Sequence, residues 1–274
     1  MASECVQVVR FVRLLRGASQ PILVEGMNGI FYVLKFRNNP QGCNVLFNDA
    51  AGIQLYRACH LPTPLWEPLH VSNGFLERNR ACWIEGPKGP IKPESGLCFG
   101  ARFLSNQSSR LFEILPGTRY DGIHDRWIFW LSWIIDACCS HTDHRQALFL
   151  KQGDNSFEAV FIDSGNLFGG PNGNEEPRPL ASRYLDPRIY PELTHTQAER
   201  IAKTIGALRP ECLFSRIQRL PTEWQTSNTL ASFSRGLGRL SDRSYIEHFL
   251  AQLVMREKSS SRHKRRTLTA ELRV

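Results

Sequence analysis

The sequence predicts an α+β fold of two lobes, with a sheet-rich N-terminal lobe that carries one helix and a mostly helical C-terminal lobe. Short β-branched and aromatic runs dominate the first third of the chain, which is typical of strands. From residue 195 onward, apolar residues recur at helical spacing. The length of 274 residues suits one large domain or two lobes.

In the N-terminal part, the apolar runs 22–25 and 30–36 flank a turn over 26–29 that contains two glycines, which predicts a β-hairpin. Apolar residues within 45–59 have a helical period, and Pro62 and Pro64 end that helix. Residues 65–100 are mixed strand and loop. A short strand over 111–115 ends at Pro116 and Gly117, where we place the boundary between the lobes.

The C-terminal part begins with a very apolar helix over 125–139. Two short strands, 147–150 and 159–162, follow and are joined by a polar turn over 152–155. Residues 169–179 are rich in Gly, Asn, Glu and Pro, which indicates a surface loop. Three helical patterns complete this part, over 198–208, 211–217 and 245–255. We therefore expect an N-terminal lobe over 1–115, a helical lobe over 116–257 and a basic, disordered tail over 258–274.

The composition indicates a cytoplasmic protein with acidic partners. The net charge is +8 and the isoelectric point about 9.2, which favours nucleotides or nucleic acid as ligands. The eight cysteines have irregular spacing and no signal peptide precedes them, so we interpret them as reduced thiols. The apolar run 127–139 is shorter than a membrane span requires, and we expect no contact with membranes.

Two aspartates, each next to an apolar run, point to phosphoryl-transfer chemistry. Asp143 lies between the apolar helix and a strand, beside Arg145, and Asp163 ends the next strand before Ser164 and Gly165. A phosphoryl-transfer site needs one carboxylate to orient the acceptor and another to hold a divalent cation against the phosphates. We therefore predict catalytic roles for Asp143 and Arg145 and a metal-binding role for Asp163.

Three N-terminal features complete such a site. Lys35 ends a strand, from which a rigid ammonium group could contact the nucleotide phosphates. Asp49, one turn into the next helix, could orient Lys35 through an ion pair. The loop with Gly17, Ser19 and Gln20 could offer backbone N–H groups to the phosphates. Each feature alone is more often an ordinary surface residue or turn, and only the ordered set is specific.

This ordered set resembles the HipA-like kinase domain family. The resemblance covers roughly residues 10–255 and rests on these segments: Arg16-Gly-Ala-Ser-Gln-Pro21, Tyr32-Val-Leu-Lys-Phe-Arg-Asn-Asn-Pro-Gln-Gly42, Asn48-Asp49, Leu61-Pro-Thr-Pro64, Phe99-Gly-Ala-Arg-Phe-Leu104, Thr142-Asp-His-Arg-Gln146, Ile162-Asp-Ser-Gly165 and Leu220-Pro-Thr-Glu-Trp224. It implies a two-lobed protein-kinase-like fold and an ATP- and Mg²⁺-dependent kinase acting on protein Ser/Thr hydroxyls. Most members are bacterial.

The resemblance also implies individual roles. Lys35 would contact the nucleotide, Asp143 would be the catalytic aspartate and Asp163 a metal ligand, while 17–20 would form the phosphate loop. HipA kinases carry a metal-binding Asn five residues after the catalytic aspartate, where this chain has Leu148. Gln146 is the nearest substitute, because a carboxamide oxygen suits a hard cation.

Two other interpretations stay open at this point. Cys138, Cys139, His141, Asp143 and His144 could form a transition-metal site, although their spacing matches no common ligand pattern. Alternatively, the protein could be a catalytically impaired pseudokinase that binds a nucleotide or a partner. Its basic tail could then attract nucleic acid weakly.

Overall fold

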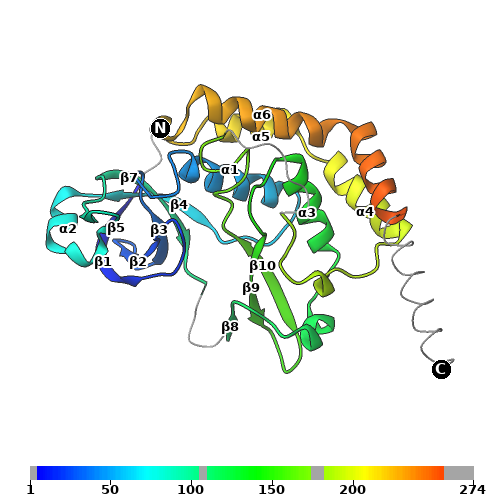
Figure 1. The fold of residues 1–274 in the computed structure, drawn as a ribbon, viewed down its shortest axis with the longest axis horizontal. Coiled ribbons are helices and arrows are strands. Elements are labelled where there is room, and N and C mark those ends of the chain that lie inside the picture. The colour runs from blue at the N-terminus through cyan, green and yellow to red at the C-terminus, as the bar shows by residue number, and fades with distance from the viewer. Residues whose placement is uncertain (1–4, 105–109, 174–181, 256–274) are drawn as a thin grey trace.

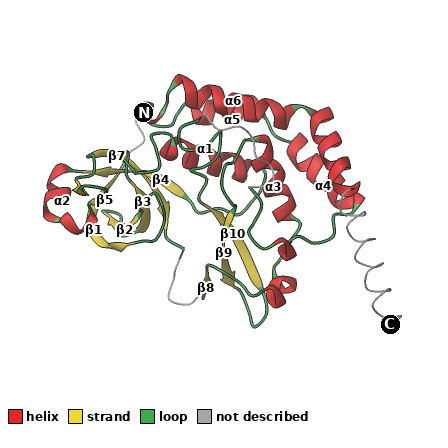
Figure 2. Ribbon diagram, in the orientation of Figure 1, coloured by secondary structure: helices red, strands yellow, loops and turns green. Residues whose placement is uncertain are grey.

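The structure, a computed structural model, describes residues 5–104, 110–173 and 182–255. The strands of an N-terminal barrel gather at one end of the molecule and helices α3 to α6, within residues 128–241, lie toward the other, while strands β8, β9 and β10, within residues 111–162, form a separate sheet in the middle (Figures 1 and 2). The predicted α+β fold with a sheet-rich N-terminal lobe and a helical C-terminal lobe is therefore confirmed. The basic tail predicted over 258–274 lies outside the described residues.

The N-terminal lobe is built on a closed five-stranded barrel with the strand order β1-β2-β3-β7-β4. Its elements are β1 (Val6–Leu14), β2 (Ile22–Gly26), β3 (Phe31–Lys35), α1 (Val45–Ala58), β4 (Trp66–Val71), α2 (Asn73–Arg78), β5 (Ile84–Gly86), β6 (Gly89–Ile91) and β7 (Gly96–Arg102), with a short 3₁₀ turn at Arg80–Cys82. The apolar interior of the barrel is one buried cluster, to which Phe75 and Leu76 of α2 also belong. The lobe therefore has a core of its own.

The strand register places two predicted parts of the site at the same end of the barrel. Leu14 pairs with Ile22 across β1 and β2, and Ile22 pairs with Leu34 across β2 and β3. Strand β2 runs antiparallel to both β1 and β3, so the β1–β2 connection lies beside the end of β3. The loop that contains Gly17 and the side chain of Lys35 therefore share one rim.

The C-terminal lobe surrounds the small sheet β10-β9-β8. The predicted lobe boundary placed the strand at 111 in the N-terminal lobe, whereas this strand, β8, pairs with β9 of the C-terminal sheet. Its elements are β8 (Leu111–Phe112), α3 (Ile128–Cys138), β9 (Gln146–Lys151), β10 (Phe157–Ile162), α4 (His195–Gly206), α5 (Pro210–Ile217) and α6 (Ser227–Ser241), with 3₁₀ turns at Gly117–Gly122, Pro187–Ile189 and Thr222–Trp224. A further helix covers 243–255. Within the described residues, no helix has the length and apolar character needed to cross a membrane.

Helix α1 lies between the barrel strands β3 and β4 in sequence but packs mainly with the C-terminal lobe. Its buried apolar residues, from Val45 to Tyr56, belong to the same cluster as those of α3, α5 and α6. In Figure 1 the helix lies between the barrel and the C-terminal helices. Because α1 is enclosed on nearly every side, its sequence is apolar around most of its circumference. The helix thus connects the two lobes physically.

Candidate active site

A buried lysine and two carboxylates form the centre of the candidate site. The Nζ atom of Lys35 lies 2.7 Å from Oδ2 of Asp49 and 2.9 Å from Oδ1 of Asp163. The lysine comes from the end of β3, Asp49 from the second turn of α1, and Asp163 directly follows β10. Residues far apart in the sequence therefore meet where the barrel, α1 and the C-terminal sheet converge.

The charges at this centre shift one another's pKa values. Burial alone would lower the pKa of Lys35, but the charges of Asp163 and Asp49 outweigh this effect and raise it. Burial favours the neutral form of Asp163, yet the nearby charge of Lys35 keeps its pKa below the ordinary value. Burial raises the pKa of Asp49 despite its contact with Lys35. Lys35 and Asp163 are therefore both ionised at neutral pH.

Helix α1 also fixes the backbone that follows Asp163. The side-chain amide of Asn48 donates to the carbonyl oxygens of Gly165, Leu167 and Gly170, at 2.9, 2.8 and 3.1 Å. Oδ1 of Asp49 accepts from the backbone N–H of Ser164 at 2.9 Å. The sequence-based site omitted Asn48, although it precedes Asp49 directly. Its three carbonyl partners make it the main anchor of the segment after Asp163.

The close approach of this segment to α1 also requires a glycine in the helix. A Cβ atom on Gly52 would lie 2.5 Å from Cβ of Ser164 and 2.7 Å from a methyl carbon of Leu167. Both distances are far shorter than van der Waals contact, so any larger side chain would push the segment away. Gly52 therefore lowers the helix propensity of α1 but allows the contact.

Asp163 and Gln146 provide oxygen atoms that suit a hard cation. Asp163 has a left-handed backbone, with φ of 57°, which aspartate tolerates better than most residues. Its Oδ2 accepts from Nε2 of Gln146 at 3.3 Å. Coordination by the amide oxygen of Gln146 would thus require the amide to turn over. One carboxylate and one carboxamide fit Mg²⁺, which commonly takes few protein ligands alongside water and substrate phosphates.

Asp143 lies on the exposed loop between α3 and β9, three residues before Gln146. Its Oδ1 accepts from the backbone N–H of His144 at 2.7 Å. Behind it, Nδ1 of the buried His141 lies 2.6 Å from the carbonyl oxygen of Asp143. Burial and the charge of Arg145 lower the pKa of His141, so the imidazole is neutral at pH 7. The carboxylate of Asp143 is therefore exposed, while His141 holds its backbone in place.

The predicted catalytic residue Arg145 does not face the exterior and requires a correction. Its side chain is 0% exposed and binds Asp136 of α3 through two hydrogen bonds of 2.7 and 2.8 Å. The Nη1 group also donates to the carbonyl oxygens of Ile162 and Asp163, at 3.1 and 3.2 Å. A buried cation needs such partners. Arg145 is thus a positioning residue that holds the end of β10, and it is not placed to touch an acceptor.

The predicted phosphate loop is shaped by Gln20. The side chain of Gln20 donates to the carbonyl oxygen of Glu85 at 3.0 Å and accepts from its N–H at 2.7 Å, while the backbone N–H of Gln20 donates to Gly17. Gly17 has a φ of 144°, a conformation that favours glycine. Ser19 is buried. The backbone N–H of Gln20 is therefore engaged within the loop, and its side chain ties the loop to β5.

The alternative transition-metal site is not assembled. Cys138 and Cys139 are buried, and burial raises the pKa of the Cys138 thiol to about 12. Throughout the described part of the chain, no group of three or more His, Cys, Asp or Glu side chains is arranged to hold a metal ion. A thiol held protonated by burial is a poor metal ligand. We discard this interpretation.

Solved kinase structures resemble the fold. The Helicobacter pylori proinflammatory kinase CtkA matches with a TM-score of 0.60 and 10% identity, over 91% of this chain and 99% of that chain. The Golgi casein kinase matches with a TM-score of 0.47 and 11% identity, over 90% of this chain and 72% of that chain. No protein-family model matches the sequence, and no curated protein matches it. The likeness to CtkA shows a kinase-like fold, while membership of the HipA-like family stays a prediction.

Proposed function

We propose that the protein is an ATP- and Mg²⁺-dependent phosphotransferase that acts on Ser or Thr hydroxyls of proteins. The observation that carries this proposal is the buried cluster of Lys35, Asp49 and Asp163 at the junction of the two lobes. An ion pair between a strand lysine and a helix carboxylate, beside a second carboxylate after a strand, is the arrangement that kinases use to hold phosphates and metal.

Each residue of the cluster has a distinct role in this proposal. Lys35 contacts the phosphates of ATP, and Asp49 keeps its ammonium group in place. Asp163 and Gln146 hold Mg²⁺, which when bound neutralises charge on the phosphate oxygens. Asp143 accepts a hydrogen bond from the attacking hydroxyl and orients it. Asn48 and Arg145 touch neither substrate, but they fix the backbone on either side of Asp163.

A catalytically impaired pseudokinase is the second candidate, and two observations favour it. The position five residues after Asp143 is Leu148, which lies within β9 and has no ligand atom. In addition, the cation two residues after Asp143 is the buried Arg145, which is bound to Asp136. A working site would gain from a metal ligand at the first position and from a free cation at the second, because both would stabilise the negative charge of the phosphoryl group during transfer. Their loss leaves the nucleotide contacts of Lys35 in place.

Phosphoryl transfer from γ-labelled ATP distinguishes the two candidates. With Mg²⁺ present, we expect label on Ser or Thr of the protein itself or of generic acidic and basic acceptor peptides, located by mass spectrometry. The Lys35→Met variant is the control for a contaminating kinase, because it removes the phosphate contact. Binding of ATP without any transfer would select the pseudokinase.

A further inference from the structure

The chain returns from the C-terminal lobe to the barrel at one short segment, residues 221–224, which we call the strut. Trp224 is 4% exposed, and its Nε1 donates to the carbonyl oxygen of Leu97 on β7 at 3.2 Å. The side chain of Gln225 donates to the carbonyl oxygens of Gln218 and Leu220, at 3.4 and 2.6 Å, which fixes the turn behind the strut. The strut is therefore a defined contact between the lobes.

One path of contacts leads from the strut to Lys35. The rings of Trp224 and Trp66 have centroids 6.1 Å apart, and Trp66 stacks on Phe99 at 5.8 Å. Phe99 of β7 is the register partner of Lys35 on β3. Aromatic rings that pack in this way contribute more than buried area alone. A displacement of Trp224 would thus be transmitted to the strand that carries Lys35.

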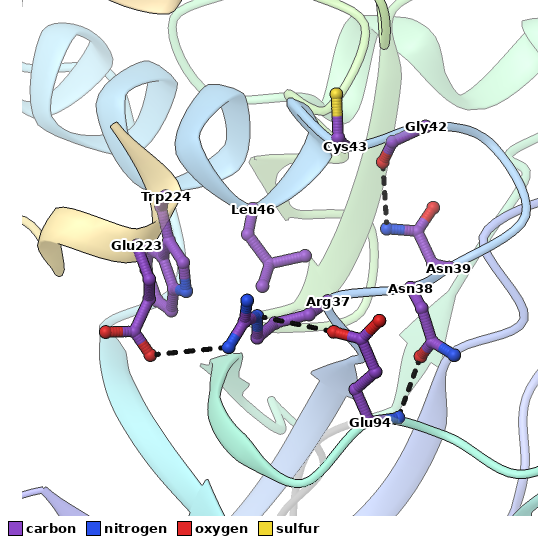
Figure 3. A pocket seen from close by; sticks show the side chains of 9 residues that line it. All are labelled: Arg37, Asn38, Asn39, Gly42, Cys43, Leu46, Glu94, Glu223 and Trp224. Atoms are coloured by element: carbon purple, nitrogen blue, oxygen red, sulfur yellow. Dashed lines mark hydrogen bonds and ion pairs between the residues drawn. The ribbon is translucent and has the colours of Figure 1, made fainter. Parts of the chain in front are cut away.

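A second path leads to Asp49 through a small cavity. Trp224 and Glu223 line a cavity of about 290 Å³ together with Arg37 and Leu46 (Figure 3). Leu46 lies on α1 three residues before Asp49, and it is buried. Arg37 follows Lys35 by two residues, and its guanidinium group lies between Glu223 at 3.9 Å and Glu94 at 3.7 Å. The strut thus pairs with the residue two positions after Lys35 and lines the same cavity as the first turn of α1, which precedes Asp49.

We infer that Trp224 and Glu223 are positioning residues that hold Lys35 and Asp49 in register for the nucleotide. This inference rests on the proposed function, because the nucleotide is the ligand whose contacts the strut would set. In a two-lobed fold the phosphate contacts depend on how the lobes are placed. The strut fixes that placement by joining β7 to a segment that lies more than a hundred residues later in the chain. Loss of the strut would loosen β3 and the start of α1 without changing any group that contacts ATP.

The first test measures nucleotide affinity in matched tryptophan variants. Trp224→Phe removes the hydrogen bond to Leu97 and shrinks the ring, and we expect it to raise the Kd for ATP with Mg²⁺ roughly 2- to 30-fold. Trp130→Phe is the control, since Trp130 also donates to a backbone carbonyl, that of Pro191 at 2.8 Å, within the C-terminal core. It should change Kd by no more than about twofold. Equal effects of the two variants on Kd would overturn the inference.

A milder variant guards against loss of folding. Glu223→Gln removes only the partly exposed charge that faces Arg37, so the fold is retained. We expect it to raise Kd by up to about fivefold at low salt, and by less at high salt, since exposed ion pairs are weak and screened. A Kd that is unchanged at low salt would show that Glu223 is not a positioning residue.

Hydrogen exchange measured without nucleotide tests the positioning role of the strut independently of whether the protein binds ATP. In Trp224→Phe we expect faster amide exchange in β3 and the first turns of α1, relative to α3 of the same molecule, and no such pattern in Trp130→Phe. If the ratio of exchange rates between these segments and α3 were the same in Trp224→Phe and the wild type, the inference would be overturned even if the protein binds ATP. If the wild type binds no ATP, the proposed function fails, and the exchange ratio still decides whether the strut positions Lys35 and Asp49.

Discussion

Replacing Asp143 with Asn is expected to slow phosphoryl transfer about 10²- to 10⁴-fold, the usual contribution of a positioned general base. The change keeps the size of the side chain and an oxygen that can accept from the N–H of His144. It removes the negative charge that would orient the attacking hydroxyl. Because Lys35 and Asp163 are untouched, the Kd for ATP with Mg²⁺ should stay within about twofold. Single-turnover transfer and nucleotide titration measure the two quantities separately.

Asp154→Asn makes the same chemical change at an exposed residue in the turn between β9 and β10. This control should transfer phosphate at the wild-type rate. If Asp143→Asn retained transfer within about tenfold of the wild type, Asp143 would not be the acceptor-orienting carboxylate.

Replacing Asp136 with Asn is expected to lower the free energy of unfolding by about 3–5 kcal/mol. Asp136 and Arg145 are both 0% exposed in their side chains, and the amide would leave the guanidinium charge of Arg145 without a counter-charge. The hydroxyl of Tyr56, which donates to Oδ1 of Asp136 at 2.6 Å, would also lose a charged acceptor. Asn has nearly the same volume as Asp, so a cavity cannot explain the loss. Equilibrium unfolding in urea measures it.

The matched control is Asp121→Asn, which breaks the ion pair between Asp121 and Arg126. Asp121 is 95% exposed, so its charge is already solvated. We expect a loss of no more than about 1 kcal/mol there. Similar losses in the two variants would mean that the Asp136–Arg145 pair is not a buried, charge-balanced anchor.

Much of the fold was predictable, and the failure to predict β1 and α6 has physical causes. The hairpin, the helix after it, the apolar helix and the two C-terminal strands all occur close to their predicted ranges. Strand β1 was missed because irregular pairing with β2, after Val8 and after Phe11, breaks the alternation of buried and exposed residues. Helix α6 was missed because it is rich in Ser and Gly. Tertiary contacts of Phe233 and Leu240 and a capping box at Thr226 stabilise it instead.

The candidate site, like the fold, was predicted in part. Lys35, Asp49, Gln146 and Asp163 were identified from their order in the chain, and the structure brings all four together. Arg145 was misplaced because a sequence motif does not show which way a side chain faces. One signal was available: Asp136 is the only charged residue within the apolar run 127–139, and a buried charge requires a partner. The strut contact was not predictable, because Trp224 and Leu97 are far apart in sequence and share no pattern.

Titration of ATP with and without Mg²⁺, in the wild type and in Asp163→Asn, tests the central claim most directly. We predict that Mg²⁺ tightens ATP binding to the wild type and that Asp163→Asn loses most of this gain. Without Mg²⁺ the variant should bind ATP at least as tightly as the wild type, because it has one negative charge fewer near Lys35. A folded wild-type protein that shows no Mg²⁺-dependent ATP binding, or an equal Mg²⁺ effect in both proteins, would contradict the account.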